Sequence, residues 1–147
     1  RRASWSITTR CDRYSQGVMT DYSFRAPSLF DPVATAIGSD TVYHDAPAVG
    51  EQLARLKPCA QWLADQLAAR GVRIVGPDID EGGWMMSVPA RNGFALIILD
   101  IRTREDQPFE LLVAKIGTAE QEVAQTKAAL RAILESSAIV HDLVIED

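Results

Sequence analysis

Residues 72–116 constrain the fold of this chain more than any other part, because short apolar runs alternate there with glycine, proline and acidic turns. Four β-strands are predicted, over residues 72–75, 84–88, 94–101 and 109–116, since β-branched and aromatic residues are enriched in strands. The pair Asn92-Gly93 between the second and third strands indicates a tight hairpin, whose turn residues must accept a positive φ. We therefore expect antiparallel neighbours.

The third predicted strand is apolar at nearly every position. Side chains alternate between the two faces of a strand, so its apolar residues form two sets that point in opposite directions: Phe94, Leu96 and Ile98 on one face, and Ala95, Ile97, Leu99 and Ile101 on the other. Both faces of this strand require cover. The strand is therefore expected at the centre of the sheet.

Two main helices are expected, one on each side of the strand region. The first follows a possible N-cap at Asp45 and ends at Gly71, and its apolar positions lie on one face: Val49, Leu53, Leu56, Ala60, Leu63 and Leu67. Pro58 interrupts it, so this element is either a kinked helix or two consecutive helices, the second beginning near Pro58.

The second helix is predicted over residues 119–136, with Thr118 and Gln121 forming a capping box. Its inward stripe contains Val123, Leu130 and Ile133, and a last strand follows at residues 139–145. The predicted fold class is α+β, with an antiparallel sheet of about four to five strands packed with two main helices. The order along the chain is helix, four strands, helix, strand.

A chain of 147 residues suits one domain, and that size buries enough surface to fold without disulfide or metal staples. We divide it into a basic N-terminal extension, 1–18, and a single α+β domain, 19–147. Met19-Thr20-Asp21 would make an ordinary bacterial start, which leaves open whether residues 1–18 belong to the native protein. Residues 24–41 are interpreted as irregular, with at most a short helix.

The charge is unevenly distributed between these two parts. Residues 1–18 carry +3 and the whole chain −5, which leaves −8 for the rest. An acidic body repels nucleic acid and favours a basic protein partner, although acidity also serves solubility. No segment reaches the roughly 18 to 20 consecutive apolar residues of a membrane helix, so a cytoplasmic protein without membrane contact is expected.

No convincing catalytic group is recognisable. His44 and His141 each precede an aspartate, but adjacent residues in an extended segment point to opposite sides and cannot form a catalytic pair locally. Cys59 lies in helical sequence, where a buried reduced thiol is expected, and a disulfide with Cys11 is not favoured. We expect no catalytic residues, no cofactor and no enzyme activity.

The acidic turn before Trp84 is the best candidate for a contact surface. It contains Asp78, Asp80 and Glu81, whose series stops at Gly82 and is too short for a calcium loop, so no metal is expected. Flexible glycines beside Trp84 would let the carboxylates and an aromatic edge face a partner. The alternative for Trp84 is a core position in line with Met86 and Val88.

The stretch from Gly76 to Trp84, Gly-Pro-Asp-Ile-Asp-Glu-Gly-Gly-Trp, resembles a turn in small uncharacterised bacterial α+β proteins, which also continue with a hairpin, an apolar strand, a helix and a closing strand. The resemblance covers residues 63–145. It departs from the pattern at Gly82 and Gly83, where an aromatic residue would be expected. It implies an α+β sandwich and, by analogy with proteins of this build, an immunity or antitoxin-type role.

Three functions follow as hypotheses. The first is a non-catalytic protein-binding module of the immunity or antitoxin type that engages a basic partner through Asp78, Asp80, Glu81 and Trp84. The second is a secretion-type chaperone or adaptor acting as a homodimer, in which a second subunit covers the two-faced third strand. The third is a small enzyme that depends on Cys59 or a histidine.

Overall fold

The computed structural model describes residues 19–30, 54–80, 83–101 and 109–147. Their elements are six strands, two α-helices and one 3-10 turn: β1 (Met19–Arg25), η1 (Pro27–Leu29), α3 (Lys57–Ala69), β2 (Val75–Asp80), β3 (Gly83–Ala90), β4 (Asn92–Ile101), β5 (Phe109–Thr118), α4 (Glu120–Ser136) and β6 (His141–Glu146). The predicted cap Asp45 and the predicted helix positions Val49 and Leu53 lie outside the described residues.

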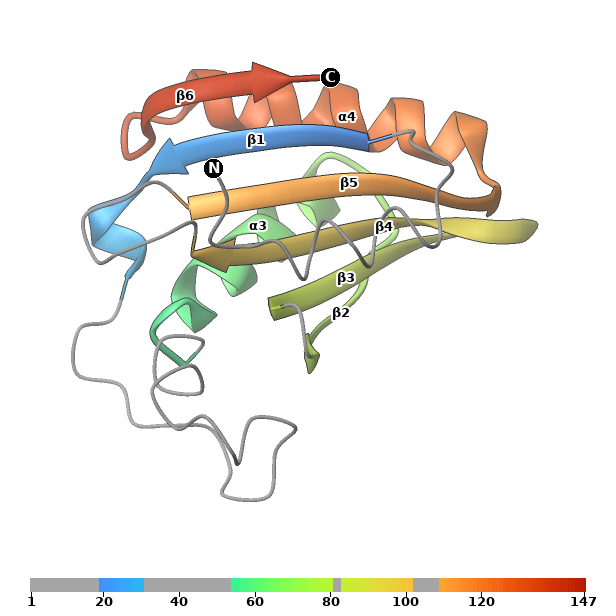
Figure 1. The fold of residues 1–147 in the computed structure, drawn as a ribbon, viewed down its shortest axis with the longest axis horizontal. Coiled ribbons are helices and arrows are strands. Elements are labelled where there is room, and N and C mark those ends of the chain that lie inside the picture. Colours follow the sequence, from blue (N-terminus) through green and yellow to red (C-terminus); the bar gives the residue numbers. More distant parts are fainter. Residues whose placement is uncertain (1–18, 31–53, 81–82, 102–108) are drawn as a thin grey trace.

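The strands form one sheet in the order β2-β3-β4-β5-β1-β6, and each neighbouring pair is antiparallel (Figure 1). The predicted α+β class with an antiparallel sheet is correct, and β4 lies inside the sheet between β3 and β5 as expected. The strand count is wrong, because the described sheet has six strands. The additional strand is β1, so the order begins with a strand and not with a helix.

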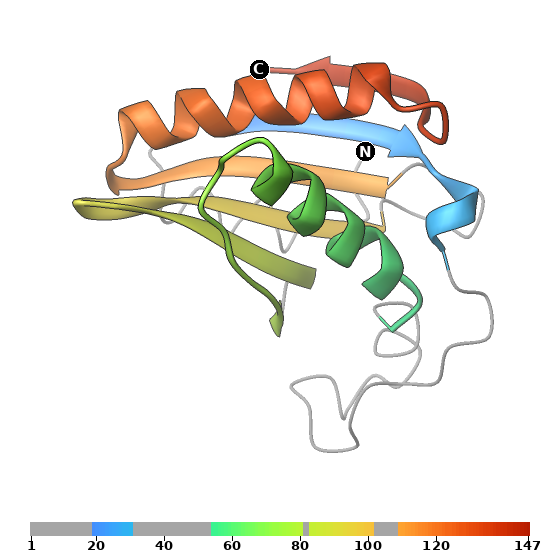
Figure 2. The same ribbon diagram turned by 180° about the vertical axis from the view of Figure 1, so that it is seen from behind.

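The sheet and the two helices form two layers. Figure 2 shows α3 and α4 in front of the strands, whereas in Figure 1 the same helices lie behind them. Both helices therefore pack on one face, which we call the helix face. We call the opposite side the second face; none of the helices in the described part of the chain lies over it.

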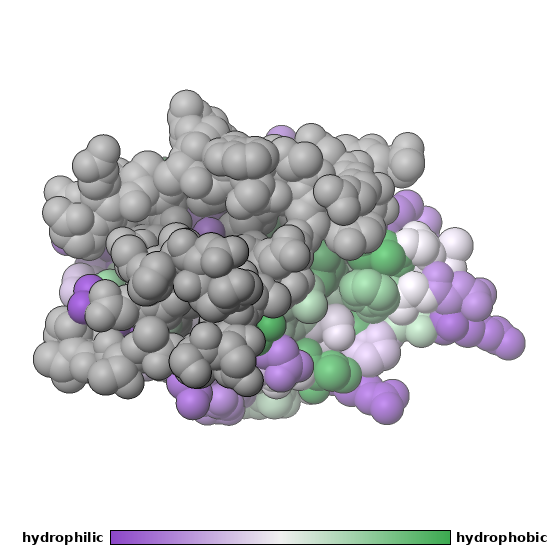
Figure 3. Space-filling model, turned by 60° about the horizontal axis from the view of Figure 1, so that its bottom comes forward, coloured by the Kyte–Doolittle hydropathy of each residue, from purple (hydrophilic) through white to green (hydrophobic). Residues whose placement is uncertain are grey.

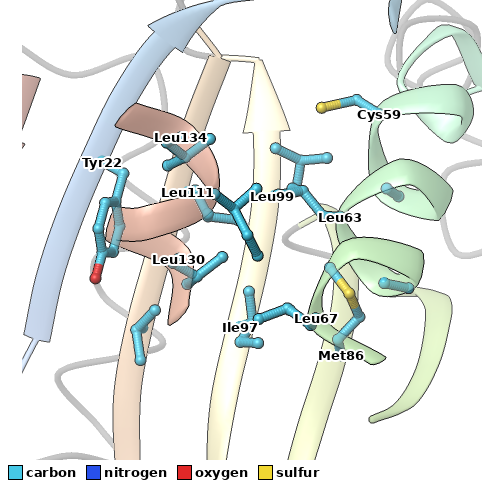
Figure 4. Close-up of a cluster of buried hydrophobic side chains, with 14 of the residues drawn as sticks. Tyr22, Cys59, Leu63, Leu67, Met86, Ile97, Leu99, Leu111, Leu130 and Leu134 are labelled. Atoms are coloured by element: carbon cyan, nitrogen blue, oxygen red, sulfur yellow. The ribbon is translucent and has the colours of Figure 1, made fainter. Parts of the chain in front are cut away.

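The main core lies between the helix face and the two helices (Figure 4). Alternate residues of each strand point into it, including Tyr22, Met86, Ile97, Leu99 and Leu111, which are almost completely buried. The inward stripes of the helices complete it with Cys59, Leu63, Leu67, Leu130 and Ile133. Full burial stabilises each large apolar side chain by roughly 1.5–3 kcal/mol, so this layer contributes most of the stability of the fold.

The second face has a smaller apolar cluster. Its buried members are Leu96, Ile98, Leu112 and Ala114, and Met19, Met85, Phe94 and Ile116 pack around them as a partly buried rim. We call these four rim residues the apolar rim. The prediction that both faces of β4 are covered is confirmed for the described side chains, because residues 95–99 are all buried.

The described end of the first predicted helix agrees with the sequence pattern. Pro58 lies in the first turn of α3, where a missing N–H costs no helical hydrogen bond. Gly71 follows the C-cap Arg70 with a φ of +83°, a left-handed conformation that glycine adopts without a steric penalty. The predicted helix face is confirmed at Leu56, Ala60, Leu63 and Leu67, which are all buried.

The N-terminus of α4 differs from the prediction. Its N-cap is Ala119, without a side-chain capping bond, so the capping box at Thr118 is wrong. The Thr118 hydroxyl instead donates a hydrogen bond of 3.2 Å to the carbonyl oxygen of Asn92, because β5 continues through Thr118 and pairs there with the start of β4. Thr118 therefore belongs to β5, although the local sequence pattern assigned it to the start of the helix.

One strand and one turn also differ from the prediction. The first predicted strand, 72–75, is displaced to Val75–Asp80, where the backbone pairs with β3 although Gly76, Pro77 and the aspartates are poor strand formers. Tertiary pairing here outweighs local preference. The predicted hairpin is present, but Ala90 pairs with Gly93, so its turn residues are Arg91 and Asn92, and neither has a positive φ.

Candidate functional site

The structure describes three of the four residues predicted as a contact surface. Asp78 is exposed on β2, Asp80 ends that strand, and Glu81 lies outside the described residues. Trp84 is only 6% exposed and packs in the main core with Met86 and Val88. Trp84 therefore occupies the core position given as the alternative interpretation.

The backbone register continues this turn into a row that crosses the sheet. Asp80 of β2 pairs with Gly83 of β3, and a Cβ atom at Gly83 would lie 3.3 Å from the Cβ of Asp100 on β4. Asp100 in turn pairs with Glu110 of β5. Gly83 has a φ of +138°, and a side chain there would clash with the carbonyl oxygen of Leu99, so only glycine fits the row at β3.

A second pair of carboxylates lies on the next two strands. Asp21 of β1 pairs with Leu112 on one side and with Glu146 of β6 on the other, which places it diagonally beside Glu110. Residues that pair directly in antiparallel strands point to the same face. We call Asp21, Asp100, Glu110 and Glu146 the carboxylate band. It lies on the second face and crosses four strands.

Like charges directly opposite each other destabilise a sheet, and the band contains two such pairs, Asp100 with Glu110 and Asp21 with Glu146. Glu110 is the most constrained member. It is 0% exposed, and neither of its carboxylate oxygens has a hydrogen-bond partner in the part of the chain that the structure describes. Burying a carboxyl group without such partners costs several kcal/mol, so the band is a place where a positive group would be stabilising.

Neither Glu110 nor Glu146 belongs to an ion pair among the described residues. Arg25 pairs with Asp142 at 3.2 Å near the band, and Lys115 pairs with Glu120 at 3.0 Å at the start of α4. The lysine hydrogen bond lowers the pKa of the Glu120 carboxyl from its usual value of 4.5. These bases are therefore engaged with other acids and do not neutralise the two band residues.

The chemistry of the band is that of an acceptor for guanidinium or ammonium groups. Over the described ranges no three histidine, cysteine, aspartate or glutamate residues are arranged to hold a metal ion. Asp21 and Asp100 are half-buried and Glu146 is exposed, so the band extends from the surface at β6 toward the interior of the second face. The apolar rim lies on the same face.

Of the thiols and histidines predicted as alternative reactive groups, the structure describes Cys59 and His141. Cys59 is a free cysteine with a completely buried side chain, as expected, and desolvation by burial raises the pKa of its thiol well above the usual 9.0. A thiol in this environment is a poor nucleophile. His141 is exposed at the start of β6, and His44 and Cys11 lie outside the described residues.

Sequence reasoning missed the band because it missed β1, whose pairing supplies Asp21 and brings β6 beside it. One signal was present. Residues 19–25 alternate between the buried Thr20, Tyr22 and Phe24 and the more polar positions between them, the period of two that is typical of a half-buried strand. The pairing of Asp100 with Glu110 also follows from a hairpin joining two strands that the sequence did predict.

None of the described helices is both long and apolar enough to span a membrane. The comparisons with known proteins add no further constraint, and the bacterial resemblance of residues 63–145 stays a prediction. Neither the family models, nor the curated proteins, nor the solved structures with which the chain was compared give a match.

Proposed function

We propose that this protein is a non-catalytic protein-binding module of the immunity or antitoxin type, which engages a basic protein partner through the carboxylate band. The observation that carries the proposal is the pairing of like charges across four strands, with Glu110 buried and both of its oxygens without a hydrogen-bond partner among the described residues. Arginine or lysine side chains of a partner would be attracted to the negative charge of the band, which is exposed at Glu146, and this long-range attraction would raise the association rate.

The charge of the chain favours a protein partner over nucleic acid. The whole chain carries −5 and residues 19–147 carry −8, and an acidic body of this kind repels phosphate groups. Guanidinium groups suit the band because they form short, charge-assisted hydrogen bonds to carboxylates, often two at a time.

The apolar rim supports a partner whose binding surface combines apolar and basic residues. Met19, Met85, Phe94 and Ile116 are partly buried on the same face as the band. In Figure 3, where the molecule is seen obliquely from below, hydrophobic (green) and hydrophilic (purple) residues lie side by side at the surface. Protein interfaces combine an apolar centre with a polar, charged border, and methionine and aromatic residues are enriched in them.

A homodimer of the chaperone or adaptor type is the second hypothesis, with a second copy covering β4. If two copies met through their second faces, the twofold symmetry would bring one carboxylate band toward the other. That arrangement adds like charges to a region that already holds two like-charged pairs. The band therefore favours a basic partner over a second copy on this face. Light scattering coupled to size-exclusion chromatography distinguishes the two, because the leading proposal expects a monomer in the absence of the partner.

The third hypothesis, a thiol-dependent enzyme, has less support. Its nucleophile would be Cys59, which is completely buried and whose pKa is raised by that burial. Resistance of the folded protein to a thiol-alkylating reagent at neutral pH is the expected result. Rapid modification of Cys59 without unfolding would favour this hypothesis over the leading one.

The proposal is tested by titrating the protein with the products of its neighbouring genes, beginning with the basic ones, at two salt concentrations. We expect one complex whose affinity falls as salt rises, since electrostatic attraction is screened over about 10 Å at 0.1 M salt. Glu146→Gln and Asp100→Asn should each weaken that complex about tenfold, because each removes a charge from the band.

The matched control is Asp65→Asn, which removes the same charge from the exposed side of α3. It should leave the affinity unchanged. Equal losses in the control and in the band variants, or a complex that is insensitive to salt, would show that general acidity and not the band attracts the partner. Absence of any complex with the basic gene products would count against the proposal as a whole.

A further inference from the structure

A second feature of interest lies on the helix face, at the other side of the sheet from the carboxylate band. A pocket of about 440 Å³ opens there between β1, α4 and the end of β6. Its polar lining comes from Thr20 and Tyr22 on β1, Lys127 and Arg131 on α4, and Asp147 after β6. Pockets of roughly 300–1,000 Å³ are the size that small-molecule ligands occupy.

The two cationic side chains of the pocket come from the same face of α4. Lys127 and Arg131 are four residues apart on α4, so they lie on one face of the helix. Lys127 Nζ is 4.0 Å from Asp147 Oδ1, and Arg131 Nε binds Glu135 Oε2 at 3.1 Å on the outer side of the helix. Neither contact fills the donor capacity of these side chains, since an ammonium group has three donors and a guanidinium group five.

Tyr22 provides the observation that points to a ligand. The residue is 1% exposed and lines the pocket, and its hydroxyl is not among the fully buried polar atoms that lack a hydrogen-bond partner in the described part of the chain. In Figure 4 its ring extends from β1 beside α4, with the oxygen pointing away from Leu134. A tyrosine hydroxyl at the wall of a pocket can donate a hydrogen bond to a bound ligand. Burial, together with the charge of Asp147, raises its pKa to about 12, so at neutral pH it is a hydrogen-bond donor.

The protein's own carboxylate shows which kind of group the pocket holds. Asp147 Oδ1 accepts a hydrogen bond of 2.6 Å from the Thr20 hydroxyl and lies near Lys127, although its side chain is mostly exposed. A carboxylate is thus already bound at the rim by a hydroxyl and a cation. The Tyr22 hydroxyl and the exposed Arg131 guanidinium would provide a similar pair of donors.

We propose that this pocket binds a small organic carboxylate with a short apolar chain, its carboxyl group held by Tyr22, Lys127 and Arg131. A monoanion fits better than phosphate, because Asp147 and Glu135 partly offset the two cations and would repel a doubly charged ligand. Met19 and Ile145 provide apolar walls for the chain of the ligand.

The site does not depend on the proposed partner binding, because the polar residues of the pocket and the carboxylate band do not overlap, and only Met19 belongs both to the pocket and to the apolar rim. Failure of one proposal therefore leaves the other standing. Binding of butyrate by a variant that has lost partner binding, such as Glu146→Gln, would demonstrate this independence.

The experiment is a titration of the isotope-labelled full chain with sodium butyrate, followed by amide chemical shifts, with inorganic phosphate as a parallel titration at equal ionic strength. We expect saturable butyrate binding with the largest shifts in residues 19–22, 127–131 and 145–147, and weaker binding of phosphate. Tyr22→Phe and Lys127→Gln should each weaken butyrate binding about tenfold, the usual effect of losing one hydrogen bond to a charged group.

Arg91→Gln is the matched control, because it removes one positive charge at the exposed β3–β4 turn and should leave the affinity unchanged. Lys127 is on the surface, so its variant keeps the test valid even if Tyr22→Phe does not fold. Shifts that do not saturate, tighter binding of phosphate than of butyrate, or equal weakening by Arg91→Gln would each overturn the proposal.

Discussion

The two faces of the sheet differ in how they bury their side chains. On the helix face, large apolar side chains of the strands are buried beneath α3 and α4. Most of the polar residues of this face lie at its margin, around the pocket. The second face has fewer apolar residues and places four carboxyl groups beside them in register. The described part of the fold is therefore stabilised mainly from the helix face, while the second face combines a small apolar cluster with acidic side chains.

The largest test of this comparison uses two leucines of β4 that point to opposite faces. Leu99 is 0% exposed in the main core, and Leu96 is 4% exposed in the smaller cluster. Leu99→Ala should lower the free energy of unfolding by about 3–5 kcal/mol and Leu96→Ala by about 2 kcal/mol, because the larger cluster leaves the larger cavity. Urea unfolding measures both. Equal losses would mean that the two faces contribute equally to stability.

The next effect concerns the buried acid of the second face. Glu110→Gln removes a carboxyl group that faces Asp100 and has no hydrogen-bond partner among the described residues. We expect the free energy of unfolding to rise by about 1–3 kcal/mol at neutral pH, since the cost of an uncompensated buried acid is relieved. The same denaturation experiment detects it. A loss of stability would instead indicate that Glu110 serves the fold and not recognition.

Tyr22 makes the helix face sensitive to alkaline pH. Its pKa is raised from 10.0 to about 12, mainly by burial and then by the charge of Asp147, so the folded state holds the proton more tightly than the unfolded state. Its contribution to stability is complete below pH 10 and is lost as the pH rises from about 10 to about 12. Thermal unfolding across this range, compared with Tyr22→Phe, isolates the effect. Parallel pH curves for the two proteins would contradict it.

A smaller effect is expected at the one polar residue in the inward stripe of α4. Thr126 is completely buried, and its hydroxyl has no hydrogen-bond partner in the described part of the chain. Thr126→Val keeps the shape of the side chain and removes that hydroxyl, so stability should rise by about 1 kcal/mol. Differential scanning calorimetry would show the higher melting temperature. An unchanged or lower melting temperature would indicate that the hydroxyl is solvated.

The smallest effect belongs to the exposed ion pair between Arg25 and Asp142, whose side chains are about half and two-thirds exposed. Arg25→Gln should change the free energy of unfolding by less than about 0.5 kcal/mol, and high salt should remove the difference. A larger loss that persists in salt would show that charges near the carboxylate band contribute more to folding than the comparison of faces allows.

The sequence was sufficient for those parts of the fold in which local pattern and tertiary packing agree. The apolar stretch of β4, the stripe of α4 and the stop at Gly71 were all predicted from their own residues. The start of β2 was misplaced because Gly76, Pro77 and Asp78 form a strand only by pairing with β3. β1 was missed because seven residues with only three inward side chains give a weak signal on their own.

The candidate sites were less predictable, since each depends on distant segments meeting. The acidic turn was recognised, but its continuation to Asp100 and Glu110 requires the register of three strand pairs. The pocket joins β1 with residues more than 100 positions later. Trp84 illustrates the remaining ambiguity: the same alternating pattern suits a core position and a contact position, and only the covering helix decides between them.

The outermost strands of the described sheet also affect how the molecule behaves in a crowded solution. An unpaired strand edge is a template onto which another chain can add, with aggregation as the result. On β2, where Val75 is 53% exposed, Pro77 lacks the amide hydrogen that such an addition would use. At the other margin, β6 has His141, Asp142 and Glu146 around the exposed Val144. Both margins thus discourage the edge-to-edge addition of strands through which sheets grow into fibrils.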